Sequence, residues 1–362
     1  MTLPPSSDGR DARRLPAWGR FVSGLTAILV VGATAYHYRG AVAGISRFVW
    51  DVGPTDVRIG SFGPNETVSL LRPDGVELVG SVYRPEGAWR ARILLVHGNT
   101  PLGRELSLYR LLGARLAERG YYVLAVDLAG FGDSGDPFQA AAPESPDIGF
   151  DVRVWLDWFE RSGLGTPLAI VAHSGGGAPA LEVGLDDERV AALALLGPPR
   201  RTSEVLSDPA QRDYFFERAQ STHRQVYGRA LPDWYTQELW LHQALGAGAL
   251  PSLQVDMERY AVELSGPNHK PVLLVDNEWE SPADLAYLRD FHSRMSDPKE
   301  YLTVPESDHY FNTRALAGRV LYDAASASQI VSAIDRWIGD RASWSREPST
   351  GAIDGGGSSR PS

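Results

Sequence analysis

The fold is decided by the stretch Leu168-Ala-Ile-Val-Ala-His-Ser-Gly-Gly-Gly177. Its apolar first half is typical of a buried strand, and the residues after Gly177 are compatible with a helix. A serine between the two fits the pattern G-x-S-x-G, in which a tight strand-to-helix turn holds the hydroxyl clear of the backbone. The residues two before and two after the serine must be small, because we expect a helix to cross the strand closely there. Ala172 stands where the pattern has its first glycine and adds one methyl group.

Further segments match the same arrangement in chain order. A buried strand runs into the turn His97-Gly98, and another strand leads into Asp127-Leu-Ala-Gly-Phe-Gly-Asp-Ser-Gly135. Later strands at Pro271–Val275 and Tyr301–Val304 come before an Asp308-His309 pair. With these motifs, the chain resembles an α/β-hydrolase from about Val68 to Ile338. The resemblance implies a mostly parallel sheet with helices on both faces and a helical cap.

Composition excludes several other classes of protein. The 362 residues are enough for one substantial core, and the formal net charge of −10 argues against nucleic acid as a partner. The absence of cysteine excludes disulfides, thiolate metal sites and a cysteine nucleophile. We find no metal-ligand spacing, dinucleotide fingerprint or phosphate-binding loop, so we expect no metal and no cofactor.

The N-terminal region carries a hydrophobic segment. The 18 residues from Phe21 to Tyr38 contain no formal charge. Their length is near the lower limit for a membrane-spanning helix. We expect a single membrane anchor within 18–40, with a cleaved signal peptide or a buried helix as alternatives. Four arginines precede the segment and two follow it closely, so the positive-inside rule places the catalytic domain outside a bacterial cytoplasm. Cleavage would instead give a secreted protein.

Expected domain boundaries follow from composition. We predict a disordered tail over 1–17, a linker over 41–66, the hydrolase domain over 67–342, a cap over about 198–270 within it, and a flexible tail over 343–362. Val68–Tyr83 predicts a hairpin with a two-residue turn at Asp74-Gly75. Helices are expected at Arg104–Arg119, Phe150–Arg161, Gly177–Leu185, Pro282–Met295 and Ser326–Ile338.

The nucleophile and its base follow from motif and chain order. A serine hydroxyl needs an adjacent base, and in this fold the order along the chain is serine, acid, histidine. Ser174 is the candidate nucleophile, and His309 is the best placed of eight histidines because it follows the last strand. His97 is expected to be structural, and His173 is expected to point away from the site as a packing residue.

The acid that orients the histidine is expected at Glu280. Aligning Pro271–Glu280 on the family's pattern of strand, His-Gly-x-x-Asp puts Glu280 where an aspartate normally sits. The sequence departs twice, with Asp276-Asn277 in place of His-Gly and with glutamate in place of aspartate. The longer glutamate moves the carboxylate, so the loop must compensate. The rivals for this role are Asp276, Glu278 and Asp284, while Asp308 adjoins the histidine too closely.

By resemblance, the oxyanion hole is formed by the backbone N–H groups of Gly175 and Asn99, with Thr100 as the alternative to Asn99. The whole set predicts a serine hydrolase that cleaves a small-molecule acyl ester, attached to a membrane by its own N-terminal segment. Its oligomeric state is left open. A peptidase, thioesterase or acyltransferase on the same triad is an alternative, as is a non-catalytic ligand-binding protein on the same scaffold. A serine rather than an aspartate nucleophile argues against dehalogenase and epoxide hydrolase chemistry.

Overall fold

The computed structural model describes residues 39–98, 100, 102–135, 147, 149–164, 167–198, 213, 217, 257–266 and 270–341. Its main sheet has eight strands in the order β2-β3-β5-β4-β6-β7-β8-β9. The strands from β5 to β9 in this order pair in parallel, and β3 pairs antiparallel with both β2 and β5. Their bounds are β2 Glu66–Leu71, β3 Glu77–Tyr83, β4 Ala91–Val96, β5 Tyr121–Val126, β6 Leu168–His173, β7 Val190–Leu196, β8 Val272–Asn277 and β9 Lys299–Val304. The predicted parallel sheet is confirmed.

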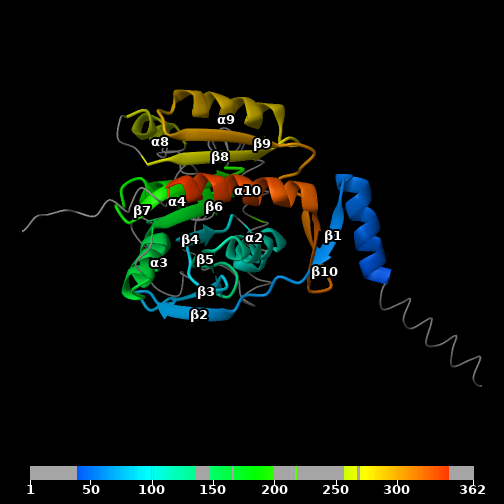
Figure 1. The fold of residues 1–362 in the computed structure, drawn as a ribbon, viewed down its shortest axis with the longest axis horizontal. Helices are drawn as coiled ribbons and strands as arrows, with labels where there is room; N and C mark the ends of the chain where they lie inside the picture. The colour runs from blue at the N-terminus through cyan, green and yellow to red at the C-terminus, as the bar shows by residue number, and fades with distance from the viewer. Residues whose placement is uncertain are drawn as a thin grey trace, which may run out of the picture. The chain divides into compact units, whose positions relative to one another are not determined.

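Helices cover both faces of this sheet (Figure 1). One face packs against α2 (Ser107–Glu118) and α10 (Ala324–Arg341). The opposite face packs against α3 (Phe150–Arg161), α4 (Gly177–Gly184), α8 (Met257–Leu264) and α9 (Pro282–Arg294). Strands buried on both faces are continuous apolar runs rather than alternating ones, which is why the sequence revealed them. The five helices expected from the sequence are all present.

The hairpin of β2 and β3 forms, but its turn differs from the expected one. The N–H of Gly75 bonds to the carbonyl of Arg72 at 2.9 Å, so Pro73 and Asp74 occupy the centre of the turn. Gly75 follows with a φ of +86°. Proline fixes its own φ near the value that the first central position of a type I turn needs. The two-residue turn at Asp74-Gly75 is therefore wrong by one position, because Pro73 decides where the chain bends.

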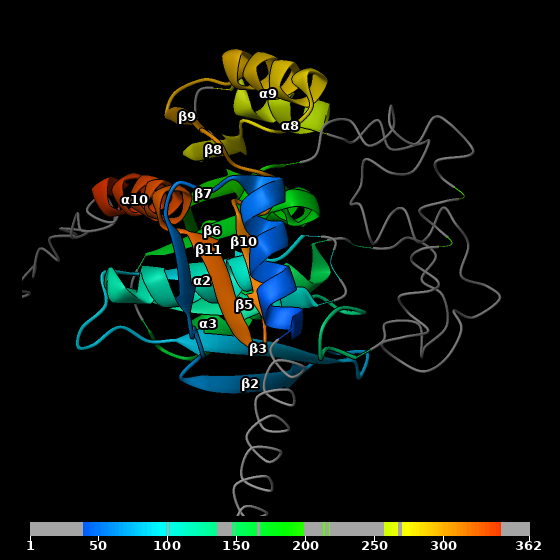
Figure 2. The same ribbon diagram turned by 90° about the vertical axis from the view of Figure 1, so that its right-hand side faces the viewer.

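A second, smaller sheet was not expected. It has the order β1-β11-β10, formed by Val57–Gly60, Arg319–Asp323 and Thr313–Leu316 (Figure 2). Strand β1 lies inside the segment 41–66 that we expected to be a linker, and a helix over 39–52 occupies much of the remainder. Because β1 pairs with β11 over four residues, the folded domain begins before residue 67.

Several expectations fall outside the described residues. These are the tail at 1–17, the hydrophobic segment up to residue 38, most of the cap at 198–270 apart from the stretch that holds α8, and the tail at 343–362. Within the described part of the chain, none of the helices has the length and apolar character to cross a membrane.

Candidate active site

Ser174 lies on a sharp turn between β6 and α4. The strand ends at His173, the turn Ser174–Gly176 is a short 3-10 helix, and α4 begins at Gly177. Ser174 has a φ of +50°, a left-handed conformation that a non-glycine residue rarely adopts. Such strain is retained where the surrounding structure enforces it, and it is frequent at active sites.

Two glycines, one in this turn and one in the turn after β4, leave room for the backbone around Ser174. A Cβ atom on Gly176 would lie 2.3 Å from the carbonyl oxygen of His97, and one on Gly98 would lie 2.7 Å from the Cβ of Ser174. We expected a crossing helix to impose the small residue after the serine. The crowding comes instead from the backbone at the end of the neighbouring strand β4, so that part of the reasoning was wrong although the residue type was right.

The structure brings Ser174, His309 and Glu280 together. The Oγ of Ser174 lies 3.0 Å from the Nε2 of His309, and the Nδ1 of His309 lies 2.9 Å from an Oε of Glu280. The three residues follow the carboxyl ends of β6, β9 and β8, which meet at one edge of the parallel sheet. Because the Glu280 carboxylate only accepts, Nδ1 of His309 carries the proton, and Nε2 is left to accept the serine hydroxyl.

Asn277 supplies a second donor to the acid. Its Nδ2 donates to the same Oε of Glu280 at 2.9 Å. The hydrogen bond from His309 is the largest cause that holds the pKa of Glu280 below its ordinary value, and the one from Asn277 acts in the same direction against partial burial. Glu280 is therefore ionised at neutral pH and oriented by two hydrogen bonds. The departure from the usual motif at position 277 was the signal that could have identified Asn277.

The rival acids have other partners. Asp276 is buried on the opposite side of β8 and accepts from the hydroxyl of Tyr301. Glu278 accepts the N–H of Glu306 at 2.7 Å, and Asp284 interacts with Ser281, which caps α9. Asp308 accepts the N–H groups of Tyr310 and Asn312 at 3.0 and 2.9 Å, so it shapes the loop that carries His309.

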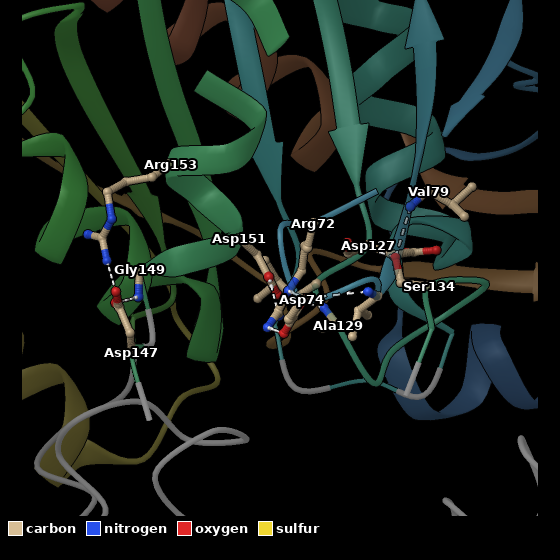
Figure 3. A network of polar contacts seen from close by, with 12 residues as sticks. Arg72, Asp74, Val79, Asp127, Ala129, Ser134, Asp147, Gly149, Asp151 and Arg153 are labelled. Carbon is tan, nitrogen blue, oxygen red and sulfur yellow. Dashed lines mark hydrogen bonds and ion pairs between the residues drawn. The ribbon is translucent and has the colours of Figure 1, made fainter. Parts of the chain in front are cut away.

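The loop after β5 is organised by buried polar contacts (Figure 3). Asp151 accepts from the N–H of Ala129 at 2.7 Å and from Arg72 at 2.7 Å. The Oγ of Ser134 accepts the N–H of Val79 at 2.9 Å and donates to the carbonyl of Asp127 at 3.0 Å. These bonds tie the loop to the hairpin of β2 and β3 and to α3. The hydroxyl of Ser134 has one partner as an acceptor and another as a donor, and both are backbone groups. Figure 3 thus supports a structural rather than a catalytic role for Ser134.

His97 connects this loop to the strand β4. Its Nε2 accepts the N–H of Leu128 at 3.0 Å, so the neutral ring carries its proton on Nδ1, 2.6 Å from the carbonyl of Gly98. Burial lowers the pKa of His97 to about 4. The structural role expected for His97 agrees with these contacts.

The expected oxyanion-hole residues are only partly described. Gly175 follows the nucleophile inside the 3-10 turn that opens α4. Asn99 lies outside the described residues. Thr100, the alternative, is buried, and its Oγ1 accepts the N–H of Leu102 at 3.3 Å.

Two residues near the site were missed or misread from the sequence. His173 does not point away from the site: its ring lies 4.9 Å from the ring of His309, centroid to centroid, and its Nε2 lies 2.8 Å from the backbone carbonyl of His309. Its Nδ1 lies 2.8 Å from the hydroxyl of Tyr109 on α2. In the sequence, Tyr109 looks like any other residue on the apolar face of a helix, and no neighbouring residue indicates that it lies near the active site.

Comparisons with known proteins concern the family and the fold. Residues 87–268 match a family model described as serine aminopeptidase, S33. No curated protein matches the chain. Among solved structures, a soluble variant of monoglyceride lipase from Saccharomyces cerevisiae is similar with a TM-score of 0.53 and 16% identity, over 76% of this chain and 96% of that one. An esterase from Pyrococcus furiosus is similar with a TM-score of 0.52 and 14% identity, over 81% and 94%. At such identities the likeness shows the α/β-hydrolase fold.

Proposed function

This chain belongs to the family described as serine aminopeptidase, S33, within the α/β-hydrolases, and on that premise we propose that it is a serine hydrolase of carboxylic esters. One observation carries the proposal: the continuous hydrogen-bonded series from Ser174 through His309 to Glu280, with separations of 3.0 and 2.9 Å. A nucleophile, a base and an orienting carboxylate in this order form the arrangement that activates a serine.

The reaction proceeds in two halves. Ser174 attacks the ester carbonyl as its proton passes to Nε2 of His309, and the tetrahedral intermediate then expels the alcohol, which takes that proton. His309 then takes a proton from water as the water oxygen attacks the acyl carbon, and it returns that proton to the Oγ of Ser174 when the bond to the acyl group breaks and the acid leaves. Glu280 remains ionised throughout and stabilises the imidazolium that forms. We assign the N–H of Gly175, which follows the nucleophile in the turn, as one donor to the oxyanion.

Ester substrates are favoured over amides for two reasons. Nothing in the sequence indicates selection for a peptide, and the similar solved structures include an esterase and a lipase. The family description names an aminopeptidase, so peptide hydrolysis is the second candidate. The two differ in the leaving group, which is an alcohol in one and an amine in the other.

The test combines covalent labelling with two substrate series. A fluorophosphonate probe should label the wild-type protein at Ser174 and leave Ser174→Ala unlabelled. A series of p-nitrophenyl esters of increasing acyl length, compared with aminoacyl p-nitroanilides, separates esterase from aminopeptidase activity. Faster turnover of the anilides would overturn the ester assignment, and the absence of labelling and turnover would indicate a non-catalytic protein.

Glu280→Gln tests the acid. The variant should fold and lose roughly 10⁴-fold in kcat, by analogy with the loss when a triad acid becomes an amide. Glu278→Gln is the matched control, because Glu278 lies two residues away and bonds to the N–H of Glu306 instead of to the histidine. Equal activity in the two variants would remove the role from Glu280.

A further inference from the structure

A line of buried polar groups runs beneath the nucleophile turn, between α2 and the loop of His309. The N–H of Gly98 lies 2.7 Å from the hydroxyl oxygen of Tyr109, which lies 2.8 Å from Nδ1 of His173. Nε2 of His173 lies 2.8 Å from the carbonyl oxygen of His309. Tyr109 and His173 are each 1% exposed, so water does not compete for these contacts.

The two ends of this line, together with a neutral His173, fix the direction of every hydrogen bond in it. The backbone nitrogen of Gly98 only donates, and the carbonyl of His309 only accepts. His173 must therefore carry its proton on Nε2 and leave Nδ1 as an acceptor. Nδ1 then receives the hydroxyl proton of Tyr109, whose oxygen accepts from Gly98. Among the neutral forms of His173, only the tautomer with its proton on Nε2 makes all three contacts as hydrogen bonds.

Both side chains are held neutral. Burial, and next the neighbouring His309, lower the pKa of His173 to about 3. Burial also raises the pKa of Tyr109 above its ordinary value. Neutrality matters because the rings of His173 and His309 lie 4.9 Å apart, and a charged His173 would repel the positive charge that His309 acquires during the proposed reaction.

The line joins the parts of the site that must move least. Gly98 belongs to the turn after β4, in van der Waals proximity to Ser174, and precedes the expected oxyanion donor Asn99. At the other end is the main chain of the base itself. We propose that Tyr109 and His173 are positioning residues that fix the main chain of His309 relative to the nucleophile turn. This inference rests on the proposed serine hydrolase function and adds two residues to its machinery.

Geometry sets the expected size of the effect. A misplacement of about 1 Å at a reacting group costs as much as 10²-fold in rate. Tyr109→Phe removes the one hydroxyl that bonds both Gly98 and His173, and it leaves two buried polar groups without that partner. We expect kcat to fall between about 10- and 100-fold while KM changes less than about twofold, because the substituted group faces the core and not the substrate.

Tyr83→Phe is the matched control. Tyr83 lies in the same hydrophobic cluster as Tyr109 and is also buried, but its hydroxyl has no hydrogen-bond partner among the residues that the structure describes. Each substitution removes one phenolic hydroxyl group and leaves the ring unchanged. Measured with one soluble p-nitrophenyl ester, Tyr83→Phe should keep kcat within about twofold, and thermal unfolding of both variants establishes that each is folded. A Tyr109→Phe protein that is folded and keeps full kcat overturns the proposal.

Variants of His173 keep the test decisive if Tyr109→Phe does not fold. The amide N–H of His173→Gln can still donate to the His309 carbonyl, whereas His173→Leu cannot donate, so the glutamine variant should retain more kcat. Equal kcat in the two variants contradicts the positioning role. Fluorophosphonate labelling of the same proteins separates this inference from the proposed function. Labelling at Ser174 with unaffected kcat in Tyr109→Phe rejects only the positioning role, whereas labelling that survives Ser174→Ala rejects the assignment of the nucleophile.

Discussion

Asn277→Ala should impair catalysis much more than it impairs folding. Asn277 donates to Glu280 at 2.9 Å and is fully buried, yet its own Oδ1 has no partner among the described residues. An unpaired buried acceptor costs about 1–3 kcal/mol of stability. A residue held at that cost for the sake of one hydrogen bond to a catalytic carboxylate fits the trade of stability for function seen at active sites.

The magnitude follows from the type of bond. A hydrogen bond to a charged group contributes about 1.5–3 kcal/mol, and each 1.4 kcal/mol lost from the transition state is a factor of ten in rate. If the bond acts by holding Glu280 against His309, Asn277→Ala should lower kcat by roughly 10- to 100-fold. The free energy of unfolding should change by less than about 1 kcal/mol, because deleting the unpaired Oδ1 offsets part of the lost packing.

Steady-state ester hydrolysis and urea unfolding measure the two quantities separately. Asp276→Asn is the control: it alters the preceding residue, whose carboxylate bonds to Tyr301 on the other face of the sheet, and kcat should stay within about twofold. The reasoning is refuted if Asn277→Ala keeps kcat within about twofold, since the glutamate would then be positioned without the asparagine. It is also refuted if the variant loses several kcal/mol of stability, since Asn277 would then be a structural residue.

Three other expectations concern separate parts of the molecule. Gly176→Ala places a Cβ 2.3 Å from a backbone carbonyl and should abolish activity or folding, whereas at Gly177 the nearest atom would be 3.5 Å away, so Gly177→Ala should preserve activity. His97 is neutral in the folded protein down to a pKa of about 4, against 6.5 for the unfolded chain, so the unfolded state binds more protons as pH falls through that window. Wild-type protein should therefore lose roughly 2 to 3 kcal/mol of unfolding free energy relative to His97→Gln between pH 7.5 and 4.5, and a pH-independent difference would contradict the neutral histidine. For the N-terminal segment, alkaline phosphatase fused after Ser343 should be active if the domain lies outside the cytoplasm, whereas a fluorescent green fluorescent protein fusion would reject that topology.

Much of the fold could be predicted because its signals are local. The strands β5, β6 and β8 are buried at every position and so appear as unbroken apolar runs. The serine turn is marked by glycines that its backbone requires, and the chain order of the fold then singled out Glu280 and His309, which the structure places in contact. Each of these inferences uses residues that are close in sequence or a fixed order along the chain.

What could not be predicted depends on contacts between distant residues. Tyr109 and His173 are 64 positions apart, and β1 meets β11 across more than 250 positions, so neither pairing leaves a trace in a local pattern. The reason that position 176 needs a glycine was also predicted wrongly, because it too depends on a residue distant in sequence. The atom that crowds it belongs to His97, directly after the neighbouring strand β4, and only the register of β4 and β6 brings it close.

The two-residue departure at Asp276-Asn277 contains two unrelated changes. Successive side chains of a strand point to opposite faces, so adjacent substitutions at the end of β8 reach different surroundings. Asp276 faces the side covered by α8 and α9, where it bonds to Tyr301. Asn277 faces the acid and tethers its carboxylate. Glutamate at position 280 and asparagine at 277 therefore belong together: the longer side chain brings an extra rotatable bond, and the amide restrains where its carboxylate lies.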